Sequence, residues 1–167
     1  MLTTSQKATQ TFVYDTYIRT TPEKLWEALT SGDFSEQYWM GFRISIEPRA
    51  GGKMSIRPPK GHEAAGDHAG KVLAWDPPRK LSYEFVVPCK SENDGRREGH
   101  SYVTFELKPM GEMVKLRVLH ENLLAEDIVK DPSTLRGINN GWPAVISSLK
   151  SLLETGKPIV VPLPEHK

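Results

Sequence analysis

The chain has 167 residues, 38% of them hydrophobic and 26% charged, and its formal net charge is +1. These values predict one globular domain over residues 1–167, with a folded core of roughly residues 11–156, a flexible N-terminus and a proline-rich C-terminal tail. The balanced charge favours neither nucleic acid nor a membrane surface as a partner, and no run approaches the roughly 20 apolar residues of a membrane span. The first ten residues lack the apolar core of a secretory signal, so we expect a cytoplasmic protein.

The first third of the chain predicts a strand followed by two short helices. Apolar and polar residues alternate over residues 10–20, and aromatic and β-branched side chains are frequent there, as in a strand. Thr21 and Pro22 then predict a helix start, because threonine caps free amides and proline fits the first turn. We expect Gly32 to end this helix, and a second helix to run from Asp33 through Trp39.

A period of two dominates the middle of the chain. Residues 42–46 and 53–57 predict a hairpin around the turn at 51–52, and further strands are expected at 68–75, 81–87, 99–108 and 114–121. The charged residues 89–98 are expected to form an exposed hairpin loop. Cys89 is the single cysteine, which excludes an intramolecular disulfide, and we expect its thiol to be unreactive.

The last part of the chain predicts one long helix from Asp131 to Gly156. Apolar residues recur there at helical spacing: Trp142, Val145, Ile146, Leu149, Leu152 and Leu153. Asp131 is the expected N-cap and Gly156 the expected C-terminal cap. Pro143 lies inside the span and has no amide hydrogen, so we expect a kink there or a helix start just before it.

This order of elements predicts an α+β fold. Successive hairpins give a curved antiparallel sheet of six or seven strands, and the long helix is the element able to cover its apolar face. A curved sheet wrapped around a helix commonly leaves a space between them. We therefore expect a functional site in that space.

The sequence resembles the START-like (SRPBCC, helix-grip) superfamily and, within it, the family of activator of Hsp90 ATPase homologues. The resemblance covers roughly residues 11–156 and rests on residues 18–30, 70–72, 76–81, 103–107, His120 and 141–156. It implies the helix-grip fold of START and Bet v 1 proteins. It implies no single activity, because this superfamily includes lipid carriers, hormone receptors, aromatic cyclases and co-chaperones.

Seven side chains are candidates for the wall of a ligand pocket: Trp39, Tyr83, Phe85, Phe105, His120, Trp142 and Ile146. His120 is a candidate for a hydrogen bond to a polar group of a ligand, or for a general base. The favoured interpretation is a core histidine bonded to a backbone carbonyl. Trp142 would stack on a flat ligand or simply fill the core, which is the commoner role. Trp39 would gate the pocket or close the core. Arg43 and Arg117 are further candidates for a polar contact.

The sequence supports no particular reaction, and we expect no catalytic residue, metal or cofactor. His62, His68 and His100 suggest a metal site, but residues 62–66 lack the second histidine of the helical zinc motif. No nucleophile with a partnered base is visible.

Two functions from different classes remain open, with a third less favoured. The first is a binding module for a hydrophobic or aromatic small molecule. The alternative is a protein-interaction module that acts as an accessory of the Hsp90 chaperone. A cyclase-like enzyme that uses His120 as a base is the less favoured reading. Exposed strands at the sheet edges leave both a monomer and a homodimer open.

Overall fold

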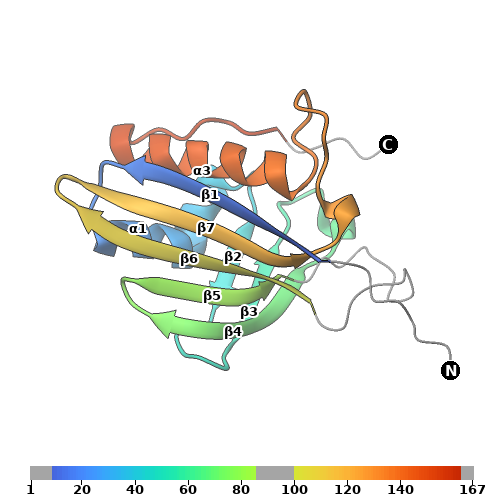
Figure 1. Cartoon of the computed structure of the whole chain (residues 1–167), viewed down its shortest axis with the longest axis horizontal. Coiled ribbons are helices and arrows are strands. Elements are labelled where there is room, and N and C mark those ends of the chain that lie inside the picture. Colours follow the sequence, from blue (N-terminus) through green and yellow to red (C-terminus); the bar gives the residue numbers. More distant parts are fainter. Residues whose placement is uncertain (1–8, 86–99, 163–167) are drawn as a thin grey trace, which may run out of the picture.

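A computed structural model describes residues 9–85 and 100–162 as an antiparallel sheet that curves around a long helix (Figure 1). The strands are β1 (Gln10–Ile18), β2 (Arg43–Ile46), β3 (Lys53–Arg57), β4 (His68–Asp76), β5 (Lys80–Phe85), β6 (Ser101–Met110) and β7 (Met113–Leu123). The helices are α1 (Pro22–Thr30), α2 (Gly32–Tyr38) and α3 (Ile138–Thr155), with short 3₁₀ turns at Glu63–Ala65 and Ala125–Asp127. This architecture confirms the predicted α+β, helix-grip fold.

The seven strands follow the order β1-β7-β6-β5-β4-β3-β2, and every neighbouring pair is antiparallel. From β2 to β7 each strand pairs with the next in sequence, as the hairpin pattern predicts. The first strand instead pairs with the last, and Phe12 lies opposite His120. This long-range pairing places β1 along the side of α3 and leaves β1 and β2 as the two edges (Figure 1).

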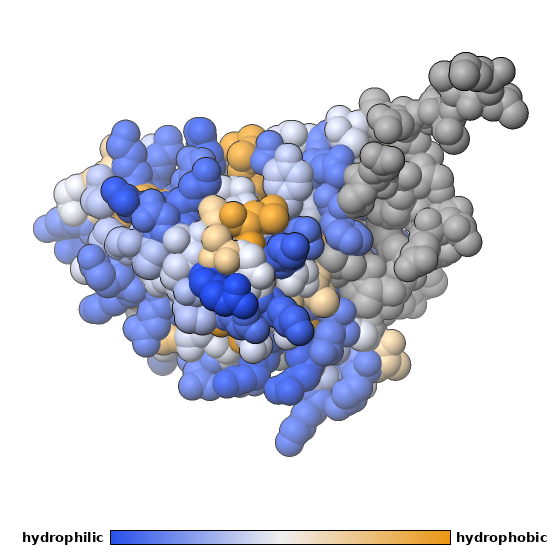
Figure 2. Space-filling view, turned by 90° about the horizontal axis from the view of Figure 1, so that it is seen from below, coloured by the Kyte–Doolittle hydropathy of each residue, from blue (hydrophilic) through white to orange (hydrophobic). Residues whose placement is uncertain are grey.

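The alternate residues that the sequence predicted to be apolar and inward-facing lie on the inner face of the sheet. On β7, Val114, Leu116, Val118 and His120 are completely buried. On the outer face of the same strand, Arg117 forms an ion pair with Asp15 of β1, in which Arg117 Nε lies 2.8 Å from Asp15 Oδ1. Hydrophilic residues likewise predominate on the face of the molecule seen in Figure 2.

The start of α1 is as predicted, whereas the start of α2 is not. The Thr21 hydroxyl oxygen accepts a hydrogen bond from the Lys24 amide at 3.3 Å, and Pro22 is the first helical residue. Gly32 does not end a helix but begins α2, because only Ser31 separates the two helices. The second helix therefore starts one residue before Asp33 and ends at Tyr38.

The N-terminal end of the long helix is a correction. Helix α3 begins at Ile138 rather than near Asp131. Its first residue therefore precedes Pro143 by five positions. The Asp131 carboxylate closes a local turn instead, since its Oδ1 accepts hydrogen bonds from the Ser133 amide (2.9 Å) and hydroxyl (2.6 Å). The predicted end is confirmed, because Gly156 caps α3 in the left-handed conformation.

The apolar stripe of α3 packs into the sheet as predicted. Trp142, Val145, Ile146, Leu149 and Leu152 are buried, and they join the inner faces of the strands in one cluster of buried side chains. Residues 157–162 form no regular element and run back along α3. There the Ser148 hydroxyl donates to the Ile159 carbonyl at 2.6 Å.

Some predicted features fall on residues that the structure does not describe. They are the flexible N-terminus over residues 1–8, the end of the strand predicted at 81–87, and the exposed loop 89–98 with Cys89. Within the parts of the chain that the structure describes, no helix is both long enough and apolar enough to cross a membrane.

Candidate functional site

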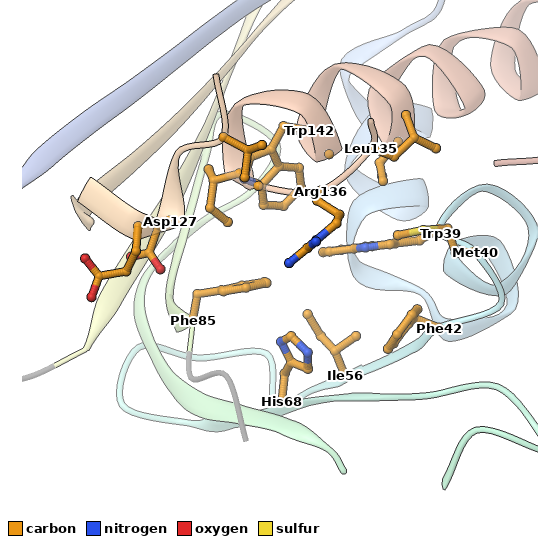
Figure 3. A pocket seen from close by; sticks show the side chains of 16 residues that line it. Trp39, Met40, Phe42, Ile56, His68, Phe85, Asp127, Leu135, Arg136 and Trp142 are labelled. Atoms are coloured by element: carbon orange, nitrogen blue, oxygen red, sulfur yellow. The ribbon is translucent and has the colours of Figure 1, made fainter. Parts of the chain in front are cut away.

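A pocket of about 440 Å³ lies between the first turns of α3, the chain that precedes α3, and one end of the sheet (Figure 3). Its wall is mostly apolar and aromatic, and the large side chains in it are Trp39, Met40, Phe42, Ile56, Phe85 and Trp142. Its ionisable residues are His68, Glu126, Asp127 and Arg136. Because Glu126 and Arg136 are exposed to solvent, the pocket meets solvent on their side.

Residues 124–137, here called the connecting segment, join β7 to α3 and form the polar side of the pocket. The first turn of α3 holds this segment in place. The side-chain amide of Asn139 accepts from the Val129 amide at 2.9 Å and donates to the Val129 carbonyl at 2.8 Å. Asn140 Nδ2 donates to the carbonyls of Asp131 (3.0 Å) and Arg136 (2.9 Å). The helix therefore fixes the segment through its own asparagine side chains.

Gly137 ends the connecting segment and explains where α3 begins. Its φ is +88°, which L-residues rarely adopt, and a Cβ there would lie 2.7 Å from a methyl group of Val129. The chain can turn into the helix at this point because glycine has no side chain. This turn carries Arg136 to the pocket.

A buried chain of hydrogen bonds joins α3 to the sheet behind the pocket. The Trp142 indole N–H donates to Nδ1 of His120 at 3.0 Å. An indole nitrogen can only donate, so Nδ1 accepts and the proton of the neutral ring lies on Nε2. Nε2 then donates to the Ser101 hydroxyl oxygen at 2.9 Å, and that hydroxyl donates to the Phe85 carbonyl at 3.0 Å. Each of these donors has an acceptor, as buried polar groups require.

The same residues bring the aromatic rings of the pocket together. Trp142 contacts Trp39 with ring centroids 5.2 Å apart and Phe85 with centroids 6.1 Å apart. Phe85 in turn meets the His68 ring edge-on at 5.0 Å. Figure 3 shows these rings arranged around a common space, with Phe42 and Ile56 below it. The rings come from β4, β5, α3 and the residue that follows α2, so no single element makes the site.

The structure divides the seven predicted pocket residues into two groups. Trp39, Phe85 and Trp142 line the pocket. The other four lie in the buried core outside the pocket lining: Tyr83, Phe105, His120 and Ile146. His120 lies next to Trp142 and Phe85 but is fully buried, as expected for a core histidine, and its partners include the Ser101 hydroxyl and the Trp142 indole.

The two arginines considered from the sequence lie elsewhere. Arg43 pairs with Asp33 at 2.8 Å and with Glu36 at 3.3 Å. Arg117 is held by Asp15 on the outer face of the sheet. Neither arginine lines the pocket.

Tyr83 is completely buried, and its hydroxyl has no hydrogen-bond partner among the described residues. Burial, with a smaller contribution from the nearby Tyr38, raises the pKa of Tyr83 well above its ordinary value. The Tyr38 hydroxyl differs because it donates to the Ala28 carbonyl at 2.8 Å. The Tyr83 hydroxyl is therefore a neutral polar group within the core.

His68 faces the pocket from β4 and is half-buried. Burial lowers the pKa of its imidazole, while the charge of Asp67 acts in the opposite direction. Its Nδ1 is buried and has no hydrogen-bond partner among residues 9–85 and 100–162. The site therefore holds a neutral imidazole with an unused nitrogen.

The sequence did not identify three of the pocket residues: Phe42, His68 and Arg136. The helix predicted to begin at residue 131 includes Arg136 in its interior. Gly137 was the available indication, because a glycine close to two asparagines (Asn139 and Asn140) is more typical of a helix boundary than of a helix interior. His68 is the first residue of β4 and Phe42 immediately precedes β2, and at strand ends the inward direction depends on register.

No group of three or more His, Cys, Asp or Glu side chains within the described parts of the chain is placed to hold a metal ion. Of the histidines considered for such a site, His68 lies in the pocket and His62 is exposed. The His100 carbonyl accepts a hydrogen bond from Asn122.

Comparison with known proteins places the chain in a family. The sequence profile of the family described as activator of Hsp90 ATPase homologue 1-like proteins matches residues 19–154, which is most of the chain. The chain belongs to this family. No curated protein sequence matches it.

Solved structures of similar proteins share the fold. A protein from Mesorhizobium loti is 27% identical with a TM-score of 0.68, and the match covers 87% of this chain and 97% of that one. The Aha1 dimer from Colwellia psychrerythraea is 21% identical with a TM-score of 0.63, over 89% of this chain and 98% of that one. An HSP90 activator from Plasmodium falciparum is 22% identical with a TM-score of 0.55, over 69% of this chain and 74% of that one.

Replacement of Trp142 by Phe tests the buried hydrogen-bond chain. The change removes the donor to His120 Nδ1 and leaves a buried acceptor unpaired, which costs about 1–3 kcal/mol beyond the loss of ring area. Urea unfolding should therefore show a larger loss of stability for Trp142→Phe than for Trp39→Phe. Trp39 is the matched control, because it is similarly buried and its indole nitrogen has no hydrogen bond within the described chain. Equal losses of unfolding free energy for the two variants would contradict the proposed contribution of the buried hydrogen bonds to stability.

The imidazole of His68 should titrate below its ordinary pKa of 6.5. In the window between the folded and the unfolded pKa, the unfolded chain binds more protons, so this histidine makes stability fall as the pH decreases through that window. NMR titration of the ring protons measures the midpoint, with a His68→Gln variant to assign the resonance. The same variant should show a weaker loss of stability on acidification. A midpoint at or above 6.5 would refute the burial argument.

Proposed function

We propose that this chain is a binding module for a hydrophobic, aromatic small molecule held in the pocket between α3 and the sheet. The observation that carries the proposal is the ring of aromatic side chains, Trp39, Phe42, Phe85 and Trp142, around a space of about 440 Å³. Ligand pockets commonly have volumes of about 300–1,000 Å³ and consist of apolar walls with a few polar groups. This pocket fits that description.

The chemistry of the wall supports a flat ligand in particular. Trp142 is held by its hydrogen bond to His120, and its ring lies at 57° to that of Phe85 and at 56° to that of Trp39. Rings held at such angles offer both faces and edges to a ligand ring, and aromatic pairs of this kind contribute about 0.5–1.5 kcal/mol each beyond the area they bury. Little side-chain entropy remains to be lost on binding, because these rings are already packed.

The geometry of His120 supports binding rather than catalysis. Its Nδ1 accepts from Trp142, its Nε2 bonds Ser101, and the side chain is completely buried. A general base must reach the proton that it removes, within about 2.6–3.2 Å or through one water. His120 would have to break one of these bonds and move before it could act on a molecule in the pocket.

Gly141 allows the pocket to be blocked without disruption of the fold. It lies in the pocket wall within α3, and a Cβ placed on it would meet nothing closer than the Leu135 carbonyl at 3.8 Å. Alanine is therefore tolerated there and should stabilise the helix by about 0.5–1 kcal/mol relative to glycine. A leucine at the same position would extend further into the pocket.

The test is a titration with N-phenyl-1-naphthylamine, a neutral aromatic probe whose fluorescence rises in apolar surroundings. Wild-type protein and Gly141→Ala should both bind it, and Gly141→Leu should bind about tenfold more weakly, because overpacking costs about 1–3 kcal/mol. Circular dichroism and the melting temperature confirm that each variant is folded. Absence of binding to wild-type protein, or equal binding by all three forms, would refute the proposal.

We also propose a second candidate, an accessory role toward the Hsp90 chaperone. Its support is the family to which residues 19–154 belong, together with the likeness in fold to the Plasmodium falciparum HSP90 activator. The argument rests on analogy, since one fold hosts many functions. No specific surface of this chain contributes to it.

Capture on the immobilised middle domain of the chaperone separates the two candidates. If the accessory role holds, wild-type protein and Gly141→Leu should be retained equally, because the change lies inside the pocket. Failure to retain wild-type protein would refute the accessory role. Retention that depends on Gly141 would connect the two functions.

A further inference from the structure

Arg136 places a positive charge on the solvent-exposed side of the aromatic pocket. Figure 3 shows its side chain extending from the connecting segment into the space between Phe85 and Trp39, above His68. No carboxylate of the described residues lies within ion-pair distance of its guanidinium. A guanidinium is always charged and offers five N–H donors, so this group has unused capacity to bind an anion.

The backbone of Arg136 is fixed on both sides, so the side chain starts from a defined position. Its amide donates to Thr134 Oγ1 at 3.1 Å, and its carbonyl accepts from Asn140 at 2.9 Å. The next residue, Gly137, begins the turn into α3. The arginine therefore belongs to the same wall as Trp142, which lies six residues later in α3.

The acidic residues of the pocket do not pair with Arg136. Asp127 Oδ2 accepts from the Leu124 amide at 2.8 Å, and neither Asp127 nor Glu126 is without a partner. In Figure 3 the Asp127 side chain lies at the margin of the pocket beyond Phe85, whereas the guanidinium lies among the rings. A ligand between the rings would meet the arginine first.

His68 supplies a second polar contact on the opposite side of the space. Its Nδ1 is buried without a hydrogen-bond partner among the described residues, although the ring lies against Phe85 and Phe42. Unsatisfied buried nitrogens are costly, and a polar atom of a ligand would satisfy this one. The pocket thus offers one strong anion-binding group and one neutral hydrogen-bonding group, within an aromatic wall.

We propose that the ligand of this pocket is a planar aromatic carboxylate, whose rings lie among Trp39, Phe85 and Trp142 and whose carboxylate pairs with Arg136. The inference rests on the proposed binding function and specifies its ligand class. The guanidinium fork matches a carboxylate in two parallel hydrogen bonds, and these charge-assisted bonds are about twice as strong as neutral ones. A cationic ligand would be repelled by Arg136.

The test uses two probes of nearly equal shape, 2-naphthoate and 2-naphthamide, which differ in charge. Isothermal titration calorimetry should show about tenfold tighter binding of the naphthoate to wild-type protein, the size expected for a partly solvated charged hydrogen bond. Arg136→Gln should weaken naphthoate binding by about tenfold and leave naphthamide binding unchanged. Arg136→Lys keeps the charge and should restore part of the preference.

Arg79→Gln is the matched control. It changes the net charge of the protein by the same amount, but Arg79 lies in the turn between β4 and β5, paired with Asp76, and does not line the pocket. This variant should bind both probes like wild-type protein. A similar loss of naphthoate binding in Arg79→Gln would reduce the effect to net charge and overturn the proposal.

The four tryptophans locate the bound probe. The indole N–H resonances of Trp39 and Trp142 should shift on addition of naphthoate, since these rings line the pocket. Those of Trp26 and Trp75 should not, because these two rings pack against each other at 5.0 Å outside the pocket lining. Shifts confined to Trp26 and Trp75 would place the probe elsewhere and overturn the proposal.

The outcomes separate this inference from the function on which it rests. Equal affinity for the two probes, or a preference for naphthoate that persists in Arg136→Gln, would overturn the assignment of a carboxylate ligand and leave aromatic binding intact. If neither naphthalene probe nor N-phenyl-1-naphthylamine binds wild-type protein, both proposals are refuted.

Discussion

The hydrogen bond from the Trp142 indole to His120 is the interaction on which the site depends. The apolar stripe of α3 presses the helix against the sheet, but hydrophobic contact has no direction and would tolerate small rotations of the helix. The indole N–H and the imidazole nitrogen must point at each other, 3.0 Å apart, so they fix the depth and angle at which Trp142 enters the core. One directional bond thereby fixes the rear wall of the pocket.

That bond also connects the core to the aromatic wall on the sheet. The chain of donors continues from His120 through Ser101 to the carbonyl of Phe85, whose side chain faces the pocket. The hydrogen bonds thus hold the backbone of Phe85, and packing against neighbouring rings holds its side chain. Low polarity around the network strengthens each bond and makes an unpaired member costly, so the arrangement favours a single geometry of the wall.

The pocket combines two kinds of structure. Its aromatic groups come from regular elements or from residues next to them, which the core holds in place. Its charged group, Arg136, comes from the connecting segment, whose position depends on the amides of Asn139 and Asn140. In a fold shared by proteins only 14–27% identical to this one, a segment of this kind is the natural place for specificity to differ, because it can change without disturbance of the sheet.

The sequence alone determined the elements whose periodicity is strong. Alternation on β6 and β7 and the helical spacing from Trp142 to Leu152 follow from local geometry, because a strand repeats every two residues and a helix every 3.6. The sequence also identified Trp39, Phe85 and Trp142 as candidates, because they are large aromatic residues at positions expected to face inward. It placed the helix start wrongly, because Asp131 and Pro132 form as good a turn as they do a helix cap, and only the contacts of Gly137 and Val129 decide between them.

Tertiary structure decided which inward residues face the pocket and which fill the core. Tyr83 and Phe85 share one parity of β5, yet the first is fully buried and the second lines the pocket. The difference arises from the curvature of the sheet and from what lies opposite each residue, neither of which is encoded within a single strand. Arg136 faces Trp39 and His68 for the same reason: residues separated by tens of positions become neighbours when β1 pairs with β7 and the connecting segment folds back over the end of the sheet. Local pattern fixes the elements, whereas the chemistry of the pocket arises from contacts that form only when those elements pack together.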